Sequence, residues 1–95
     1  MLIEKVGEPA ALELLAEECV ELAHAALKLA RIERGENPSP LEREECIEKV
    51  IEEMADVRIC LNEFKGADWL NLDDLIDTEV SKYERMEKRL KEANR

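Results

Sequence analysis

The feature that most constrains the fold is a run from Ala10 to Ile32 in which alanine and leucine predominate and glycine and proline are absent. Wound as an α-helix, at about 100° per residue, the run gathers apolar side chains on one side, namely Leu12, Leu15, Cys19, Leu22, Ala26 and Leu29. The whole chain is rich in Ala, Leu, Glu, Lys and Arg and has only three glycines and three prolines. Such a composition is typical of an all-α protein.

Capping and turn residues divide the rest of the chain. We predict one domain, residues 1–95, with three main helices, at about 9–33, about 40–65 and about 72–92. The first helix ends by Gly35, the residue type most common just after a helix. The second begins at the capping box Ser39-Pro40-Leu41-Glu42, and Asn71 caps the third. Residues 1–7 fit either an extension of the first helix or a separate short arm.

The second predicted helix is amphipathic in its first half only. From Met54 to Phe64 it is apolar on nearly every side, and a helix that is apolar all round is buried all round. Three helices of a 95-residue chain supply too few neighbours for that burial, because a chain this short has a limited core. We therefore expect the first two helices to run antiparallel and to complete a four-helix bundle with a second copy of the chain.

Charge and cysteine content limit the partners and the compartment. The formal net charge of −10 argues against a nucleic acid polymer or an anionic membrane as partner, because both are polyanions. Cys19, Cys46 and Cys60 lack the spacing of metal ligands and fall on apolar or intermediate helix faces, which predicts reduced core thiols in a cytoplasmic protein. The chain has no apolar run of transmembrane length, and residues 1–7 lack a signal-peptide hydrophobic region.

Two acidic stretches share one spacing. Glu17-Glu18-Cys19-Val20-Glu21 in the first helix and Glu52-Glu53-Met54-Ala55-Asp56 in the second each place two acids three residues apart, on one helix face. Several of these carboxylates border apolar residues, where a charge is costly unless it is compensated, and the nearest basic residue within helical reach of the first stretch is Lys28. Antiparallel helices bring four acids together, and oxygen ligands without His or Cys suit Mg²⁺ or Mn²⁺. The predicted metal ligands are Glu18, Glu21, Glu53 and Asp56.

Solvation is the alternative interpretation of these acids. Glutamate is common on the surface of acidic helices, and Glu44-Glu45-Cys46-Ile47-Glu48 has the same spelling as the first stretch. The acids of this third stretch lie mostly off the apolar side of the second helix, so we expect water to solvate them. The paired occurrence of the other two stretches beside apolar surface favours a metal site.

This pair of motifs resembles the MazG-like all-α nucleoside triphosphate pyrophosphohydrolases, with EExxE on one long helix, ExxD on the next, and then an apolar run and a basic-rich helix. The likeness extends from about Leu12 to Leu90. It implies Mg²⁺-dependent hydrolysis of a (deoxy)nucleoside triphosphate between the α and β phosphates, giving the monophosphate and pyrophosphate. It also implies an obligate homodimer or a dimer of dimers. The separation between the half-motifs is longer here than is usual in that family. The metal and catalytic set implied by the resemblance is Glu17, Glu18, Glu21, Glu53 and Asp56.

Hydrolysis of a phosphoanhydride needs neutralised phosphates and an aligned water. Carboxylate-bound metal ions supply both, and a carboxylate that is not fully used as a ligand accepts the proton, for which Glu17 or Glu18 is our candidate. Lys82 and Arg85 in the third helix are candidates to contact the β and γ phosphates, and Lys28 is a further one.

The candidate substrate contacts also have ordinary structural roles open to them. Helical ion pairs with neighbouring glutamates would account for Lys82 and Arg85. Trp69, in the loop before the third helix, is a candidate to stack on a nucleotide base, and it could equally cover one end of a bundle.

Two further classes of protein compete with the hydrolase. Glu21-Leu22-Ala23-His24 spells ExxH, the half-motif of di-iron carboxylate bundles, but His24 is the only histidine, so only a symmetric dimer could supply the second half. The other class is a non-catalytic acidic helical dimer that serves as an interaction module.

Overall fold

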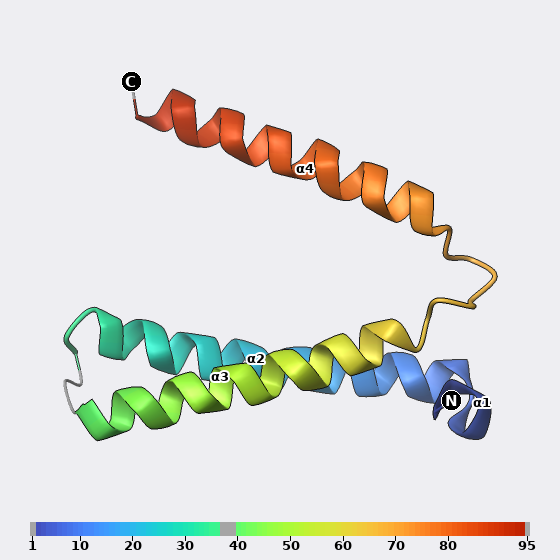
Figure 1. Ribbon diagram of the computed structural model, residues 1–95, viewed down its shortest axis with the longest axis horizontal. Coiled ribbons are helices and arrows are strands. Elements are labelled where there is room, and N and C mark those ends of the chain that lie inside the picture. The colour runs from blue at the N-terminus through green and yellow to red at the C-terminus, as the bar shows by residue number, and fades with distance from the viewer. Residues whose placement is uncertain (1, 37–39, 95) are drawn as a thin grey trace. The chain divides into compact units, whose positions relative to one another are not determined.

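A computed structural model describes residues 2–36 and 40–94. The chain is all-α, as predicted, and the described residues contain no β-strand. The described residues form one short helix and three long ones (Figure 1), which are α1 (Leu2–Val6), α2 (Glu8–Glu33), α3 (Pro40–Asn62) and α4 (Leu72–Ala93). They form two compact units, Met1–Phe64 and Lys65–Arg95. The four-helix bundle with a second copy involves another chain and stays a prediction.

The N-terminal segment forms a short helix of its own. Gly7 has a φ of 85°, a left-handed conformation that glycine adopts without steric cost, and it separates α1 from α2. Pro9 follows in the first turn of α2, where its missing N–H leaves no hydrogen bond unmade. The backbone N–H of Ile3 donates to Glu63 Oε1 at 3.2 Å, so α1 is held both to the end of α3 and against α2.

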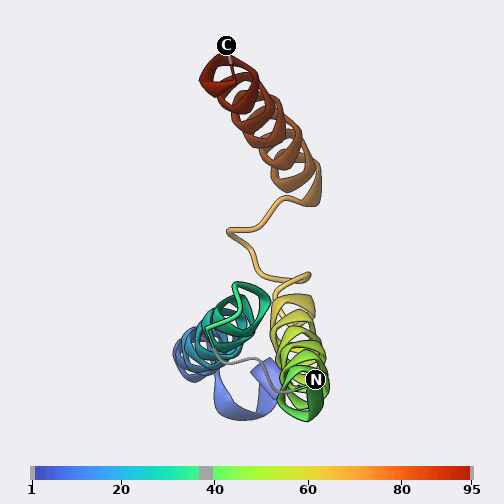
Figure 2. The same cartoon turned by 90° about the vertical axis from the view of Figure 1, so that its left-hand side faces the viewer.

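Helices α2 and α3 run antiparallel and pack along their length, side by side in both views (Figures 1 and 2). Most of the buried side chains between them are small, which allows a close approach of the two backbones. The buried apolar residues are Ala11, Ala25, Ile32, Cys46, Val50, Cys60 and Phe64. Glu53 is buried among them, with an exposed fraction of 3%.

The ends of α2 and α3 follow local backbone chemistry. After α2, Gly35 has a φ of 80° and donates its N–H to the Ile32 carbonyl at 2.9 Å, as expected of a glycine that ends a helix. Helix α3 ends at Asn62 and continues as a turn, whereas the sequence predicted helix to about residue 65. Ser39, the predicted cap of α3, lies outside the described residues.

The prediction that all three cysteines are core thiols is wrong for the single chain. Leu12, Cys19 and Ala26, on the predicted apolar side of α2, are exposed, because Glu18, and not Cys19, lies on the side of α2 that faces α3. The reduced core thiols are therefore Cys46 and Cys60 only. In the second half of α3, the antiparallel partner covers only one side of the helix, and burial of the other sides by a second copy of the chain stays a prediction. Its exposed apolar residues include Met54, Ile59 and Leu61.

Helix α4 belongs to the second unit. The side-chain oxygen of Asn71 accepts the backbone N–H groups of Asp73 and Asp74 at 2.9 and 3.1 Å, which confirms the predicted cap. None of the residues of α4 is buried. Its large apolar side chains are exposed within this unit: Leu72, Leu75, Ile76, Val80, Tyr83, Met86 and Leu90. None of the described helices has the length and apolar character that crossing a lipid bilayer requires.

Candidate metal centre

Three carboxylates converge between α2 and α3. Glu18 of α2 and Glu53 and Asp56 of α3 each offer an oxygen atom, and these three oxygens lie within 4.8 Å of one another. Glu53 and Asp56 share a helix face because they are three residues apart, and the antiparallel packing brings Glu18 opposite them. Burial falls from Glu53, which is buried, through Glu18 to Asp56, which is exposed. The cluster thus lies at the edge of the helix interface, with one side open to solvent.

Two oxygens of this cluster are buried without a hydrogen-bond partner among the described residues. They are Glu18 Oε2 and Glu53 Oε2. A buried carboxylate oxygen that lacks a donor is unfavourable. A bound cation would satisfy both oxygens, and carboxylate oxygens are the ligands that Mg²⁺ and Mn²⁺ prefer. The donor set therefore fits a hard divalent cation.

The carboxylates of the cluster repel one another. Burial raises the pKa of Glu18 above its usual value of 4.5, and the negative charges of Glu21, Asp56 and Glu53 raise that pKa further. A divalent cation would reverse these charge effects, because its charge favours the ionised carboxylate. A cation bound at this cluster would therefore lower the raised pKa of Glu18.

A lysine compensates the buried member of the cluster. Lys49 Nζ lies 2.8 Å from Glu53 Oε1, one helical turn away on α3, and this hydrogen bond holds the pKa of Glu53 below its usual value. The same contact raises the pKa of Lys49. Sequence reasoning looked for cations near the first acidic stretch and missed Lys49. The signal was present in the four-residue spacing between Lys49 and Glu53.

The remaining predicted acids flank the three-carboxylate cluster. Glu21 is exposed and lies close enough for a hydrogen bond and its charge to act on the pKa of Glu18. Glu17 is exposed and is not part of the group of three. Its catalytic role stays a prediction.

The acids of the third stretch, from Glu44 to Glu48, are all exposed, as expected of a solvated face.

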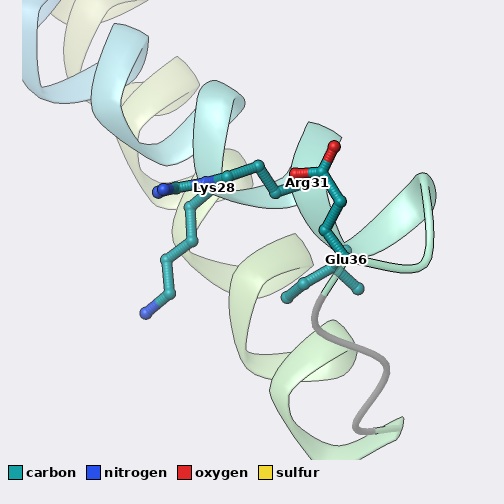
Figure 3. A pocket seen from close by; sticks show the side chains of 4 residues that line it. Lys28, Arg31 and Glu36 are labelled. Atoms are coloured by element: carbon teal, nitrogen blue, oxygen red, sulfur yellow. The ribbon is translucent and has the colours of Figure 1, made fainter.

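Lys28 lies in the same unit as the cluster. It is exposed on α2, two helical turns beyond Glu21, and therefore about 10 Å along the helix axis from that residue. With Arg31, Ile32 and Glu36 it lines a hollow at the C-terminal end of α2. Figure 3 shows the Lys28 and Arg31 side chains extending to one side of the view and the Glu36 carboxylate lying on the other. Lys28 thus offers a solvent-facing positive charge near the cluster.

The other predicted substrate contacts belong to the second unit. Lys82 and Arg85, with Met86 and Arg89, line a hollow on α4. Trp69, in the segment before α4, is exposed over about half of its surface. The roles of Lys82 and Arg85 in phosphate binding, and of Trp69 in base stacking, stay predictions.

Thiol and imidazole groups do not join the cluster. Burial raises the pKa of the Cys60 thiol, as do the nearby charges of Glu18 and Asp56, so Cys60 remains a neutral core thiol. His24 is exposed on α2, and the group of potential ligands found among the described residues contains no histidine. The ligand chemistry here is that of oxygen.

Comparison of the chain with protein-family models, with curated proteins and with solved structures finds no match.

Proposed function

We propose that this protein hydrolyses (deoxy)nucleoside triphosphates between the α and β phosphates in a Mg²⁺-dependent reaction, giving the nucleoside monophosphate and pyrophosphate. The observation that carries the proposal is the convergence of Glu18, Glu53 and Asp56, two of which have buried oxygens without a hydrogen-bond partner. The resemblance of the paired motif to the MazG-like pyrophosphohydrolases supplies the substrate class. Mn²⁺ is the expected substitute for Mg²⁺, since both prefer oxygen ligands.

The residues divide into groups by task. Glu18, Glu53 and Asp56 hold the metal, with Glu21 beside them. Bound Mg²⁺ supplies neutralisation of phosphate charge and acidifies the attacking water. Glu17 or Glu18, whichever is not fully used as a metal ligand, accepts the proton of that water.

Basic and aromatic residues complete the proposed substrate contacts. Lys28 meets the phosphates from α2, and Lys82 and Arg85 meet the β and γ phosphates. Trp69 stacks on the base.

We further propose that the working form is a homodimer or a dimer of dimers in a cytoplasmic compartment. This proposal is supported by the large apolar side chains that α2 and α3 leave exposed. Single exposed apolar residues are normal on a protein surface, but groups of them on two helices favour a surface that is covered by a partner. These apolar side chains are Leu12, Val20, Leu27, Ile51, Met54, Ile59 and Leu61.

One observation favours a second candidate, a non-catalytic acidic helical dimer. The Lys49–Glu53 ion pair already compensates one buried carboxylate without a metal. In that case Mg²⁺ has no site, and the protein shows no stabilisation by the ion.

The decisive experiment incubates the protein with a panel of nucleoside triphosphates and Mg²⁺ and measures the release of pyrophosphate, as distinct from orthophosphate. Glu53→Gln should abolish pyrophosphate release, because it removes a ligand charge from the centre of the cluster, while helicity and oligomer mass stay unchanged. Glu45→Gln, in the solvated third stretch, is the matched control and should retain activity. Full activity of Glu53→Gln would remove Glu53 from the site and contradict the proposed mechanism.

A further inference from the structure

Lys49 links the buried carboxylate Glu53 to solvent. Its side chain is 60% exposed, whereas the Glu53 side chain to which it donates is 3% exposed. The ion pair therefore runs from the interior of the α2–α3 interface to the surface. An isolated helical pair of this spacing usually has both members solvated, so a half-buried pair at a carboxylate cluster calls for a specific cause.

Glu53 is not used up by this lysine. Its Oε1 accepts a hydrogen bond from the Lys49 ammonium group, while its Oε2 is buried and has no hydrogen-bond partner among the described residues. An ionised carboxylate has about four lone-pair sites and can serve two positive partners. Glu53 can thus bind a cation and Lys49 together.

The position of Lys49 also suits contact with a ligand. Lys49 lies one helical turn before Glu53 on α3, and because α2 and α3 run antiparallel this is the direction in which Glu21 follows Glu18 on α2. Lys28 lies further along α2 in the same direction from Glu21. A chain of phosphates that starts at the carboxylates and extends this way passes Lys49 first.

We propose that Lys49 is a phosphate-contacting residue of this site, which holds Glu53 when no ligand is present and donates to a non-bridging oxygen of a metal-bound polyphosphate. The inference rests on the proposed function and adds to it a residue on α3. Its positive charge opposes binding of a cation alone and favours binding of the anion that follows. Substitution of Lys49 should therefore move the two affinities in opposite directions, whereas loss of a merely structural residue would weaken both.

Isothermal titration calorimetry on the full chain tests this with two probes, Mg²⁺ alone and inorganic pyrophosphate in the presence of Mg²⁺. For Lys49→Met, the Kd for Mg²⁺ should fall about threefold to tenfold, because a positive charge beside the ion has been removed. The Kd for pyrophosphate should rise about tenfold or more, the value of one charge-assisted hydrogen bond. Lys49→Arg keeps the charge and should restore most of the pyrophosphate affinity.

Arg58→Met is the matched control for loss of one positive charge. Arg58 is exposed on α3 nine residues after Lys49, and therefore on the opposite side of that helix. It should bind both probes as the wild type does, and circular dichroism should show unchanged helicity in all variants.

The possible results separate the two proposals. If the wild type binds Mg²⁺ and pyrophosphate but Lys49→Met binds pyrophosphate equally well, the role of Lys49 is overturned and the proposed function stands. If Lys49→Met weakens the binding of both probes equally and Lys49→Arg does not restore it, Lys49 has a structural role and the inference is overturned as well. If the wild type binds no Mg²⁺, both proposals fail.

Discussion

In the unit formed by α1, α2 and α3, one glutamate, Glu53, is almost completely buried, while in the unit that contains α4 the apolar side chains from Leu72 to Leu90 all remain exposed. The sequence of α4 is amphipathic along its length, whereas that of α3 is amphipathic in its first half only. Regular patterning therefore did not determine burial within either unit. A charge held in an interface points to chemistry, whereas an apolar stripe without a cover in its own unit points to association.

The largest expected effect concerns the response of the first unit to Mg²⁺. At a Mg²⁺ concentration about 100 times the Kd, the wild-type protein should gain about 2.7 kcal/mol in free energy of unfolding. Glu18→Gln combined with Asp56→Asn should abolish this gain, because it removes two of the three ligands. Glu45→Gln combined with Glu48→Gln removes the same charge from a solvated face and should leave the gain intact. Thermal unfolding with and without Mg²⁺ measures this gain in each double variant. If both double variants lose the gain equally, the stabilisation by Mg²⁺ is general charge screening and not binding at the cluster.

The second unit should respond to loss of apolar surface and not to Mg²⁺. Ile76→Ser should lower the free energy of unfolding of the assembled protein by about 2 kcal/mol, the value of burying one such side chain, and should shift the sedimentation profile toward smaller species. Glu84→Ser, on the polar side of α4, is the control. If Ile76→Ser leaves both stability and mass unchanged, the stripe on α4 is solvated and the contrast between the two units disappears.

The smallest expected effect is a pH dependence of the Mg²⁺ response. The pKa of Glu18 is raised above 4.5 in the folded protein, so ionisation of Glu18 destabilises the metal-free form as the pH rises through that raised value. The lowered pKa of Glu53 has the opposite sign, and the stability it contributes is present above 4.5 and is lost as the pH falls through the lowered value. Since Mg²⁺ would bind the ionised form of Glu18, its stabilising effect should grow as the pH rises from about 4.5 through that raised pKa. Glu18→Gln should remove this growth, and melting curves over the pH range measure it.

Local chemistry made several features predictable from sequence. Asn71 caps α4 and Gly35 ends α2 because each satisfies backbone groups that lie next to it in the chain. That Glu18 and Glu21 share one face of α2, and Glu53 and Asp56 one face of α3, was predictable because each pair has a three-residue spacing. These predictions needed only helical periodicity.

Features that depend on how the helices meet were not predictable in the same way. A rotation of α2 by one residue places Glu18 toward α3 and leaves Cys19 exposed, and apolar periodicity cannot distinguish these two phases when the true inward side includes a carboxylate. The contact of Lys49 with Glu53 depends on burial of Glu53 by the opposite helix. The apolar side of α4 can be covered only by groups outside its own unit, and the sequence of α4 indicates only that those groups are apolar.

The small side chains between α2 and α3 act as spacers for the acids beside them. Ala25 and Cys46 are buried there, and their size determines how near the two backbones come, and hence how wide a gap the carboxylates must span. Oxygen ligands lie at about 2.0–2.1 Å from Mg²⁺ but at about 2.3–2.6 Å from Ca²⁺. If the cluster binds a cation as proposed, small side chains that do not touch the ion would therefore help to set the preference between these two ions, and a bulkier residue at position 25 would shift that preference toward the larger radius.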